Sequence, residues 1–126
     1  YVGQAIFIRR DIEPPQLFYS FDFHLPGNAK KHHPEGLVIV AKFLSAKLII
    51  VSTYAPNNGG SQQSFARRRD WDKAVEVALG GLRRRNPTMH VIWMGDLNVC
   101  TDEHDVSGNP VRLSAVELSS AVVLNG

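Results

Sequence analysis

A carboxylate and an amide two residues apart, Asp96 and Asn98, follow an apolar run that predicts a strand over His90–Met94. In an extended chain the side chains at i and i+2 point to the same side, so these two can converge on one ligand. Gly95 just before them removes side-chain bulk where a ligand has to approach. Carboxylate oxygen suits Mg²⁺ or Mn²⁺, and Mg²⁺ commonly accompanies phosphate. The pattern predicts a divalent-metal and phosphate site, and a plain Asp-Asn turn is the alternative that the spacing leaves open.

A second polar pair, Tyr54 and Asn57, follows another apolar run and brackets Pro56. A tyrosine hydroxyl and an asparagine amide are hydrogen-bond donors that can bind a phosphate oxygen. A strand-ending aromatic residue followed by a Pro-Asn turn is the competing interpretation.

Three arginines, Arg67, Arg68 and Arg69, fall early in a predicted helix over Gln63–Arg85. Cations there oppose the positive end of the helix dipole, so their position hints at an anionic partner, although solvated arginines are the alternative. We expect Arg67 and Arg68 to contact nucleic acid. The three arginines at the end of the same helix favour the dipole and need no ligand.

The elements that must position these residues can be read from apolar periodicity and turn residues. The helix over 63–85 has a single apolar stripe, and Gly80–Gly81 within it predicts a late bend or an early end. The run His90–Met94 predicts a strand buried on both faces. We predict an α/β fold in which a mixed sheet is covered by helices. The expected strands are 4–9, 17–23, an antiparallel hairpin of 37–43 with 47–54, and 90–94; loops follow at 24–36, 55–61 and 95–112, and a last helix runs from Ser114 toward Leu124.

The composition is that of one globular domain. The chain has 126 residues, 44% hydrophobic and 21% charged, with a formal net charge of +2, so nucleic-acid binding has to be argued from local clusters of charge. The single cysteine excludes an internal disulfide within this sequence and fits a reducing compartment. No apolar run reaches the length of a membrane span, and we expect no membrane association.

Taken together, the motifs resemble the exonuclease III-type apurinic/apyrimidinic (AP) endonucleases of the endonuclease/exonuclease/phosphatase superfamily. The order and spacing of the segments agree with that family over about residues 35–110. The combination is much more specific than any single piece. The matching segments are Glu35–Phe43, Val51–Asn57, Trp71–Asp72, Gly95–Val99, Asp105–Val106 and Asn109–Pro110.

The resemblance implies part of a four-layer α/β sandwich with the DNase I-like fold. It also implies Mg²⁺-dependent cleavage of DNA 5′ to abasic sites, with 3′-exonuclease or 3′-phosphodiesterase activity. Carried over to this chain, Asp96 would orient or deprotonate the attacking water and bind metal together with Asn98. Tyr54 would contact the scissile phosphate, supported by Asn57. We expect the partner to be duplex DNA with abasic sites, and the protein to be an intracellular monomer, nuclear if its source is eukaryotic.

Some family features are missing or altered in this sequence. The amino-terminal metal-binding Asn and Glu segments and the carboxy-terminal Asp and Ser-Asp-His segments have no counterpart, so we expect residues 1–126 to be the central part of a longer domain and a poor catalyst alone. Leu37 replaces a common Arg, and Gly59–Gly60 occupy a loop where DNA-contacting Arg is frequent. Two alternatives remain: another phosphodiesterase of the superfamily (retroelement endonuclease, deadenylase, inositol or sphingolipid phosphatase), or a non-catalytic nucleic-acid-binding copy.

Overall fold

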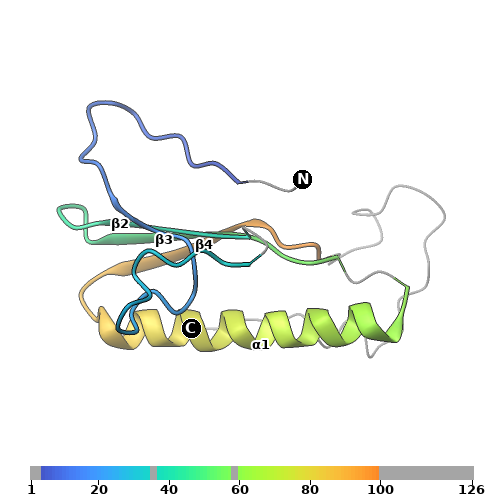
Figure 1. The fold of residues 1–126 in the computed structure, drawn as a ribbon. Coiled ribbons are helices and arrows are strands. Elements are labelled where there is room, and N and C mark those ends of the chain that lie inside the picture. The colour runs from blue at the N-terminus through green and yellow to red at the C-terminus, as the bar shows by residue number, and fades with distance from the viewer. Residues whose placement is uncertain (1–3, 35–36, 58–59, 100–126) are drawn as a thin grey trace.

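The computed structural model describes residues 4–34, 37–57 and 60–99. In this part of the chain a four-stranded mixed sheet is covered on one face by a long helix (Figure 1). The strands lie in the sheet in chain order, β1-β2-β3-β4. The elements are β1 (Gln16–Phe18), β2 (Val38–Phe43), β3 (Leu48–Tyr54), α1 (Gln62–Arg85) and β4 (His90–Asp96). The predicted mixed α/β fold is therefore confirmed.

The β2–β3 hairpin forms as the sequence predicts. The two strands pair antiparallel, with Val40 opposite Val51. β-Branched residues dominate both strands because they pack well on a pleated surface. Every second side chain faces α1, and on that face Val40, Ile49 and Val51 are fully or almost fully buried. The hairpin is thus the centre of the core.

Helix α1 returns the chain so that β4 runs parallel to β3, with Ile50 opposite Ile92. Its apolar stripe of Trp71, Val75, Leu79 and Leu82 is buried against the sheet, as the periodicity predicts. A strand, a crossover helix and a parallel strand bring the carboxyl ends of β3 and β4 to the same edge. Figure 1 shows that α1 begins beneath this edge.

The predicted bend at Gly80–Gly81 does not occur, because α1 runs without interruption to Arg85. Gly81 is buried, and a Cβ there would lie 2.8 Å from Nη1 of Arg85, whose side chain folds back over it. At the end of the helix, the Leu82 carbonyl accepts two bonds from Asn86, one from its backbone amide at 3.0 Å and one from its side-chain amide at 2.9 Å.

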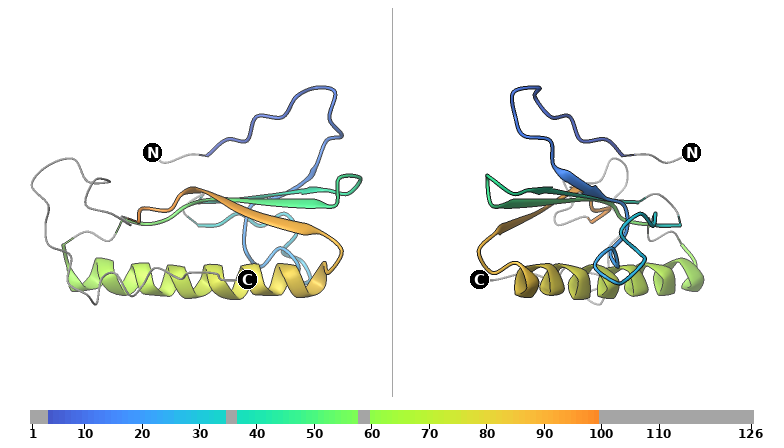
Figure 2. Two further views of the ribbon diagram at one scale, coloured as in Figure 1. Left: turned by 180° about the vertical axis from the view of Figure 1, so that it is seen from behind. Right: turned by 60° about the vertical axis from the view of Figure 1, so that its left-hand side comes forward.

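The amino-terminal predictions are partly wrong. Residues 4–9 form no strand, and Phe7 is 97% exposed. This segment crosses the face of the sheet opposite α1 (Figure 2), where Ser52 donates a hydrogen bond to Gln4. The expected strand 17–23 shortens to β1, because Phe21 leaves the sheet to pack against Trp71 with ring centroids 5.4 Å apart. Both segments have a strand-like sequence, but neither forms the full predicted strand. A strand forms only where its backbone can hydrogen-bond to a neighbouring strand.

The prediction that β4 is buried on both faces is wrong. Ile92 and Met94 are 48% and 51% exposed, whereas Val91 and Trp93, which alternate with them along the strand, pack toward the core. Exposure alternates because α1 covers only one side of the sheet in the described residues. The expected helix from Ser114 and most of the loop 95–112 lie outside the described residues, so the predicted four-layer sandwich stays a prediction.

Candidate functional site

Tyr54 and Asp96 meet at the carboxyl end of the parallel strand pair. They are register partners at the last position of β3 and β4. Residues directly opposite each other in a sheet project to the same face. The pairing continues one step beyond, since the Ala55 amide donates to the Asp96 carbonyl at 2.8 Å. Two residues that lie 42 positions apart in the sequence (96 − 54) are therefore held side by side.

Asp96 is exposed, and its carboxylate orders the residues that follow. Oδ1 accepts a hydrogen bond from the Asn98 backbone amide at 3.0 Å. This bond is an Asx turn, so the turn that the sequence left open as an alternative is real. The turn uses only one of the two carboxylate oxygens in the described structure, which leaves Oδ2 for a ligand. The local turn and a ligand-binding role are thus compatible.

Asn98 adopts a left-handed backbone conformation with φ of 46°. Asparagine tolerates this region better than most residues. Its side-chain Nδ2 donates to the Ala55 carbonyl at 2.7 Å, which ties the loop after β4 to the loop after β3. Because the nitrogen is committed to the backbone, Oδ1 is the side-chain atom that remains to accept a bond from water or to coordinate a cation.

Gly95 is required by the close approach of the two strands. Its φ is +128°, and a Cβ would lie 2.0 Å from the Thr53 carbonyl oxygen. No real Cβ contact is that short, so any side chain here has to displace β3 or β4. The sequence indicated that Gly95 makes room for a ligand, but in the structure it makes room for the neighbouring strand.

Arg68 lies beneath both strand-end loops, which we define as residues 55–57 and 97–99. Its guanidinium donates to the carbonyl oxygens of Pro56 (3.2 Å), Leu97 (2.9 Å) and Asn98 (2.9 Å). Nε donates to Asp72 one helical turn away at 2.9 Å. Arg68 is only 8% exposed. The expected contact between Arg68 and DNA is not the role that these bonds support.

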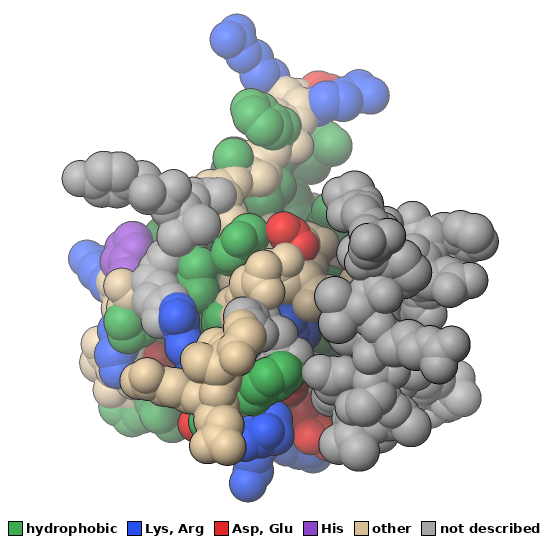
Figure 3. Space-filling model, turned by 90° about the vertical axis from the view of Figure 1, so that its right-hand side faces the viewer, with side chains coloured by type: hydrophobic (Ala, Val, Ile, Leu, Met, Phe, Trp, Pro, Cys, Tyr) green, Lys and Arg blue, Asp and Glu red, His purple; other side chains and the backbone are tan. Residues whose placement is uncertain are grey.

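The other two expected DNA contacts lie at the surface. Asn57 closes the described part of the loop after β3, and Arg67 precedes the buried arginine on α1; both are exposed. Figure 3 views this end of the molecule and shows an acidic side chain at the surface among hydrophobic and polar ones, with basic side chains nearby. The structure thus brings Tyr54, Asp96 and Asn98 together, and Asn57 is an exposed residue of the loop that follows Tyr54.

The residues present fit a hard divalent cation in part. Asp96 supplies an exposed carboxylate and Asn98 an amide oxygen, the oxygen ligands that Mg²⁺ selects. Among the described residues no group of three or more His, Cys, Asp or Glu side chains gathers to hold a metal. Mg²⁺ usually keeps several waters and takes one or two carboxylates plus phosphate oxygens, so a single carboxylate is compatible with it.

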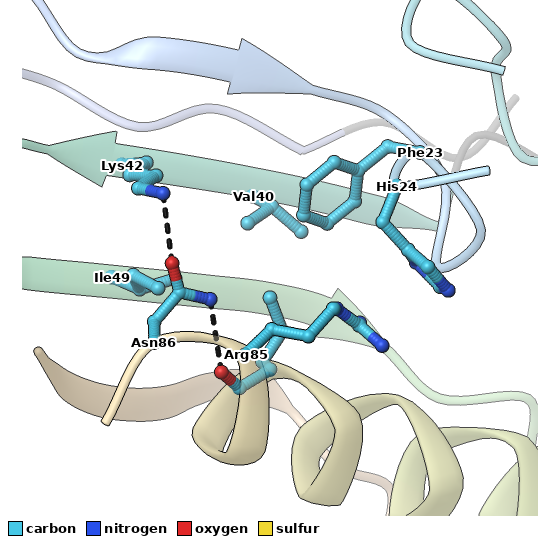
Figure 4. A pocket seen from close by; sticks show the side chains of 8 residues that line it. Phe23, His24, Val40, Lys42, Ile49, Arg85 and Asn86 are labelled. Carbon is cyan, nitrogen blue, oxygen red and sulfur yellow. Dashed lines mark hydrogen bonds between the residues drawn. The ribbon is translucent and has the colours of Figure 1, made fainter. Parts of the chain in front are cut away.

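A cavity of about 180 Å³ lies at the opposite end of the sheet (Figure 4). Here Lys42 Nζ donates to the Asn86 side chain at 2.8 Å, above an apolar wall that includes Leu82. None of its lining residues belongs to the strand-end loops. The cavity is therefore separate from the candidate site, which is an exposed edge and not a deep pocket.

Two residues of the matching segments contribute to the site although no role was assigned to them from the sequence. Thr53 Oγ1 accepts from the Trp93 indole at 2.9 Å and joins β3 to β4 one residue before the site. Asp72 holds Arg68, and the i, i+4 spacing of an Arg and an Asp is a signal that could have suggested this pair. The backbone carbonyls that bind Arg68 carry no sequence signal at all.

The class of protein follows from this arrangement and from comparison with known proteins. A mixed sheet with a crossover helix, carrying Tyr and Asp-x-Asn at the ends of its parallel strands, is consistent with a fragment of an AP endonuclease fold. No family model matches the sequence. Within the described residues, no helix combines the length and apolar character needed to cross a membrane.

Similar proteins carry the name DNA-(apurinic or apyrimidinic site) endonuclease. One from Arabidopsis thaliana is 35% identical over 127 aligned residues, 99% of this chain and 32% of that protein. One from Plasmodium falciparum is 34% identical over 85% of this chain and 16% of its own length. One from Dictyostelium discoideum is 40% identical over 64% of this chain and 21% of its own length. The chain is thus related to AP endonucleases, which confirms the resemblance of the motifs, and it spans about a third or less of these relatives.

Proposed function

We propose that the protein to which this chain belongs is an AP endonuclease that hydrolyses the DNA backbone 5′ to abasic sites in a Mg²⁺-dependent reaction. The observation that carries the proposal is the convergence of Tyr54, Asp96 and Asn98 at one strand edge. The names of the relatives support its endonuclease part, since they describe endonucleases that act at abasic sites in DNA and these proteins are related over most of this chain. We include 3′-exonuclease or 3′-phosphodiesterase activity in the proposal, because it needs the same phosphate and water geometry.

Phosphodiester hydrolysis requires a water molecule oriented for attack, compensation of the negative charge on the phosphate, and a fixed geometry between the two. In the proposed mechanism Asp96 orients the attacking water through a carboxylate oxygen and accepts its proton. The water oxygen bonds to phosphorus as the P–O3′ bond on the 5′ side of the abasic site breaks, and the leaving 3′ oxygen takes up a proton from solvent. Asn98 Oδ1 accepts a hydrogen bond from the same water, and the Tyr54 hydroxyl donates to a phosphate oxygen. A bound Mg²⁺, held by Asp96 and Asn98, would neutralise charge on the phosphate.

Backbone hydrogen bonds, and few additional side chains, fix the positions of Asp96 and Asn98. The Asx turn fixes Asp96 relative to the next loop, and the Asn98–Ala55 bond fixes that loop relative to β3. Groups held by backbone pairing and short turns lose little freedom when substrate binds, which is the basis of preorganised catalysis.

For the DNA partner we propose contacts from the exposed residues Asn57 and Arg67. An amide and a guanidinium at the rim of the site can donate to phosphate oxygens on either side of the scissile bond. We further propose that the protein acts as a monomer inside the cell, in the nucleus of a eukaryotic source.

The experiment is incision of a labelled duplex with one abasic site by the complete protein. We expect cleavage 5′ to the site with Mg²⁺, loss of at least about a hundredfold in rate after chelation with EDTA, and recovery on adding Mg²⁺ back. An intact duplex of the same sequence is the control substrate, and poly(A) and a phosphoinositide test the other activities of the superfamily. Equal cleavage with and without divalent metal, or faster turnover of poly(A) or phosphoinositide, would contradict the proposal.

A further inference from the structure

We propose that Arg68 is a positioning residue: its guanidinium clamps the two strand-end loops to α1 and thereby sets the position of Asn98 relative to Tyr54. The inference rests on the proposed function and deepens it. It also replaces the direct DNA contact that the position of Arg68 near the start of the helix suggested. The carrying observation is a set of four hydrogen bonds from one buried side chain.

The clamp joins three separate pieces of the chain. Nη1 bridges the loops, since it donates to Pro56 in one (3.2 Å) and to Asn98 in the other (2.9 Å). Nη2 adds a second bond to the latter loop at Leu97 (2.9 Å). A guanidinium has five N–H donors in a rigid plane, so it reaches three carbonyls and a carboxylate at once.

Burial makes these bonds costly to lose. The Arg68 side chain is 10% exposed and its ion-pair partner Asp72 is 25% exposed. A carbonyl that loses its donor in such a place carries an uncompensated desolvation penalty unless water replaces the donor. The charged arginine is likewise tolerated at 8% exposure because Asp72 and the carbonyl dipoles compensate it.

The clamp acts on Asn98, whose backbone conformation is unfavourable for most residues and has to be held in place. Asn98 has a left-handed backbone, and three bonds hold it there: the Asp96 carboxylate on its amide, Ala55 on its side chain and Arg68 on its carbonyl. Removal of the third bond frees the carbonyl and lets the peptide after Asn98 rotate. The side-chain oxygen that is proposed to hold water then moves with it.

Phosphate binding is a poor alternative for Arg68. Each of its three nitrogens already donates to an acceptor within the protein, and the side chain is buried beneath the loops. A phosphate would have to displace carbonyls that hold the site together. The two roles differ in salt dependence, because only a phosphate contact contributes to counterion release on DNA binding.

The test compares Arg68→Lys with Arg69→Lys in the complete protein. Lysine keeps the charge but cannot span the loops, because its ammonium is a single point of donation. Arg69 is the exposed neighbour on the same helix and keeps its charge in the control. The measurements are the single-turnover incision rate with Mg²⁺, and the affinity for abasic duplex in EDTA at several salt concentrations.

We expect Arg68→Lys to lower the incision rate by about a hundredfold, the size of effect that a misplacement of about 1 Å produces. Affinity should stay within about twofold and the slope of affinity against salt should not change. Arg69→Lys should incise at the wild-type rate. The contrary outcome is read in Arg68→Gln, which removes the charge: a salt slope reduced by about one in this variant, with the affinity lost in proportion, would overturn the proposal in favour of a phosphate contact. An undiminished incision rate would overturn it as well.

Asp72→Asn provides a second variant should Arg68→Lys not fold. It keeps the shape of the acceptor, removes its charge and loosens the guanidinium. We expect a smaller loss of rate, about tenfold, with DNA affinity unchanged; a rate within about twofold of wild type would reject the clamp. Asp96→Asn in the same assay separates the two proposals. If Asp96→Asn is inactive and Arg68→Lys is fully active, the clamp is rejected and the proposed function stands. If Asp96→Asn is fully active, the proposed function is rejected together with the clamp that rests on it.

Discussion

Replacement of Asp96 by Asn in the complete protein is expected to lower the rate of abasic-site incision by about a thousandfold. Asn keeps the shape of the side chain and the oxygen that accepts from the Asn98 amide, so the Asx turn should persist. It removes the negative charge and the basicity that the proposed mechanism assigns to this group. General-base catalysis contributes typically about 10²–10⁴-fold, and loss of metal affinity adds to the effect.

The assay is single-turnover incision with enzyme in excess over a labelled abasic duplex. Asp70→Asn is the matched control, since Asp70 is an exposed aspartate on α1. We expect the control to incise at the wild-type rate and both variants to bind the duplex in EDTA with unchanged or tighter affinity. An Asp96→Asn rate within threefold of wild type would remove Asp96 from the mechanism.

Replacement of Gly95 by Ala is expected to have the largest effect on stability. The new Cβ would meet the Thr53 carbonyl oxygen at 2.0 Å and the Thr53 amide nitrogen at 2.9 Å, both of them backbone atoms of the paired strand. Backbone atoms cannot move aside as a flexible side chain can, so the β3–β4 pairing has to open. We expect the free energy of unfolding to fall by more than about 3 kcal/mol, or soluble protein to be lost.

Urea denaturation of the complete protein measures this effect, and Gly27→Ala is its control. Gly27 also has positive φ, +80°, but a Cβ there meets nothing within 4 Å. The control therefore isolates the conformational strain, about 1 kcal/mol, from the steric clash. Equal destabilisation by the two substitutions would show that the close approach of β3 and β4 does not constrain Gly95.

The elements that could be predicted from the sequence are those whose pattern is local. The β2–β3 hairpin has two β-branched runs with a short link, and α1 has a long apolar stripe and is capped by Asn86. Residues 4–9 have an equally strand-like sequence, yet no strand pairs with them in the described residues. The exposure of Ile92 and Met94 also escaped prediction, because it depends on what covers the far face of the sheet.

In the candidate site, too, some features could be predicted from local sequence patterns and others could not. Tyr54 and Asp96 each end a strand, so their meeting could be anticipated once the strands were taken as parallel neighbours. The position of Arg68 could not be anticipated, because its acceptors are backbone carbonyls 12 to 30 residues away. Backbone acceptors look alike in any sequence. The helix dipole is the signal that the sequence offers for a charge early in a helix, and the tertiary hydrogen bonds of Arg68 are visible only in the structure.

The central claim is that Tyr54 and Asp96 act on one phosphate from one strand edge, and a double-mutant cycle tests it most directly. Single-turnover incision rates are compared for the wild type, Tyr54→Phe, Asp96→Asn and the double variant. We expect Tyr54→Phe alone to cost about a hundredfold, as loss of one donor to a reacting oxygen does. Because groups that act as a unit are not additive, the double variant should be within about threefold of Asp96→Asn alone. Losses that multiply in full in the double variant, or no loss in Tyr54→Phe, would show that the two residues do not share a catalytic site.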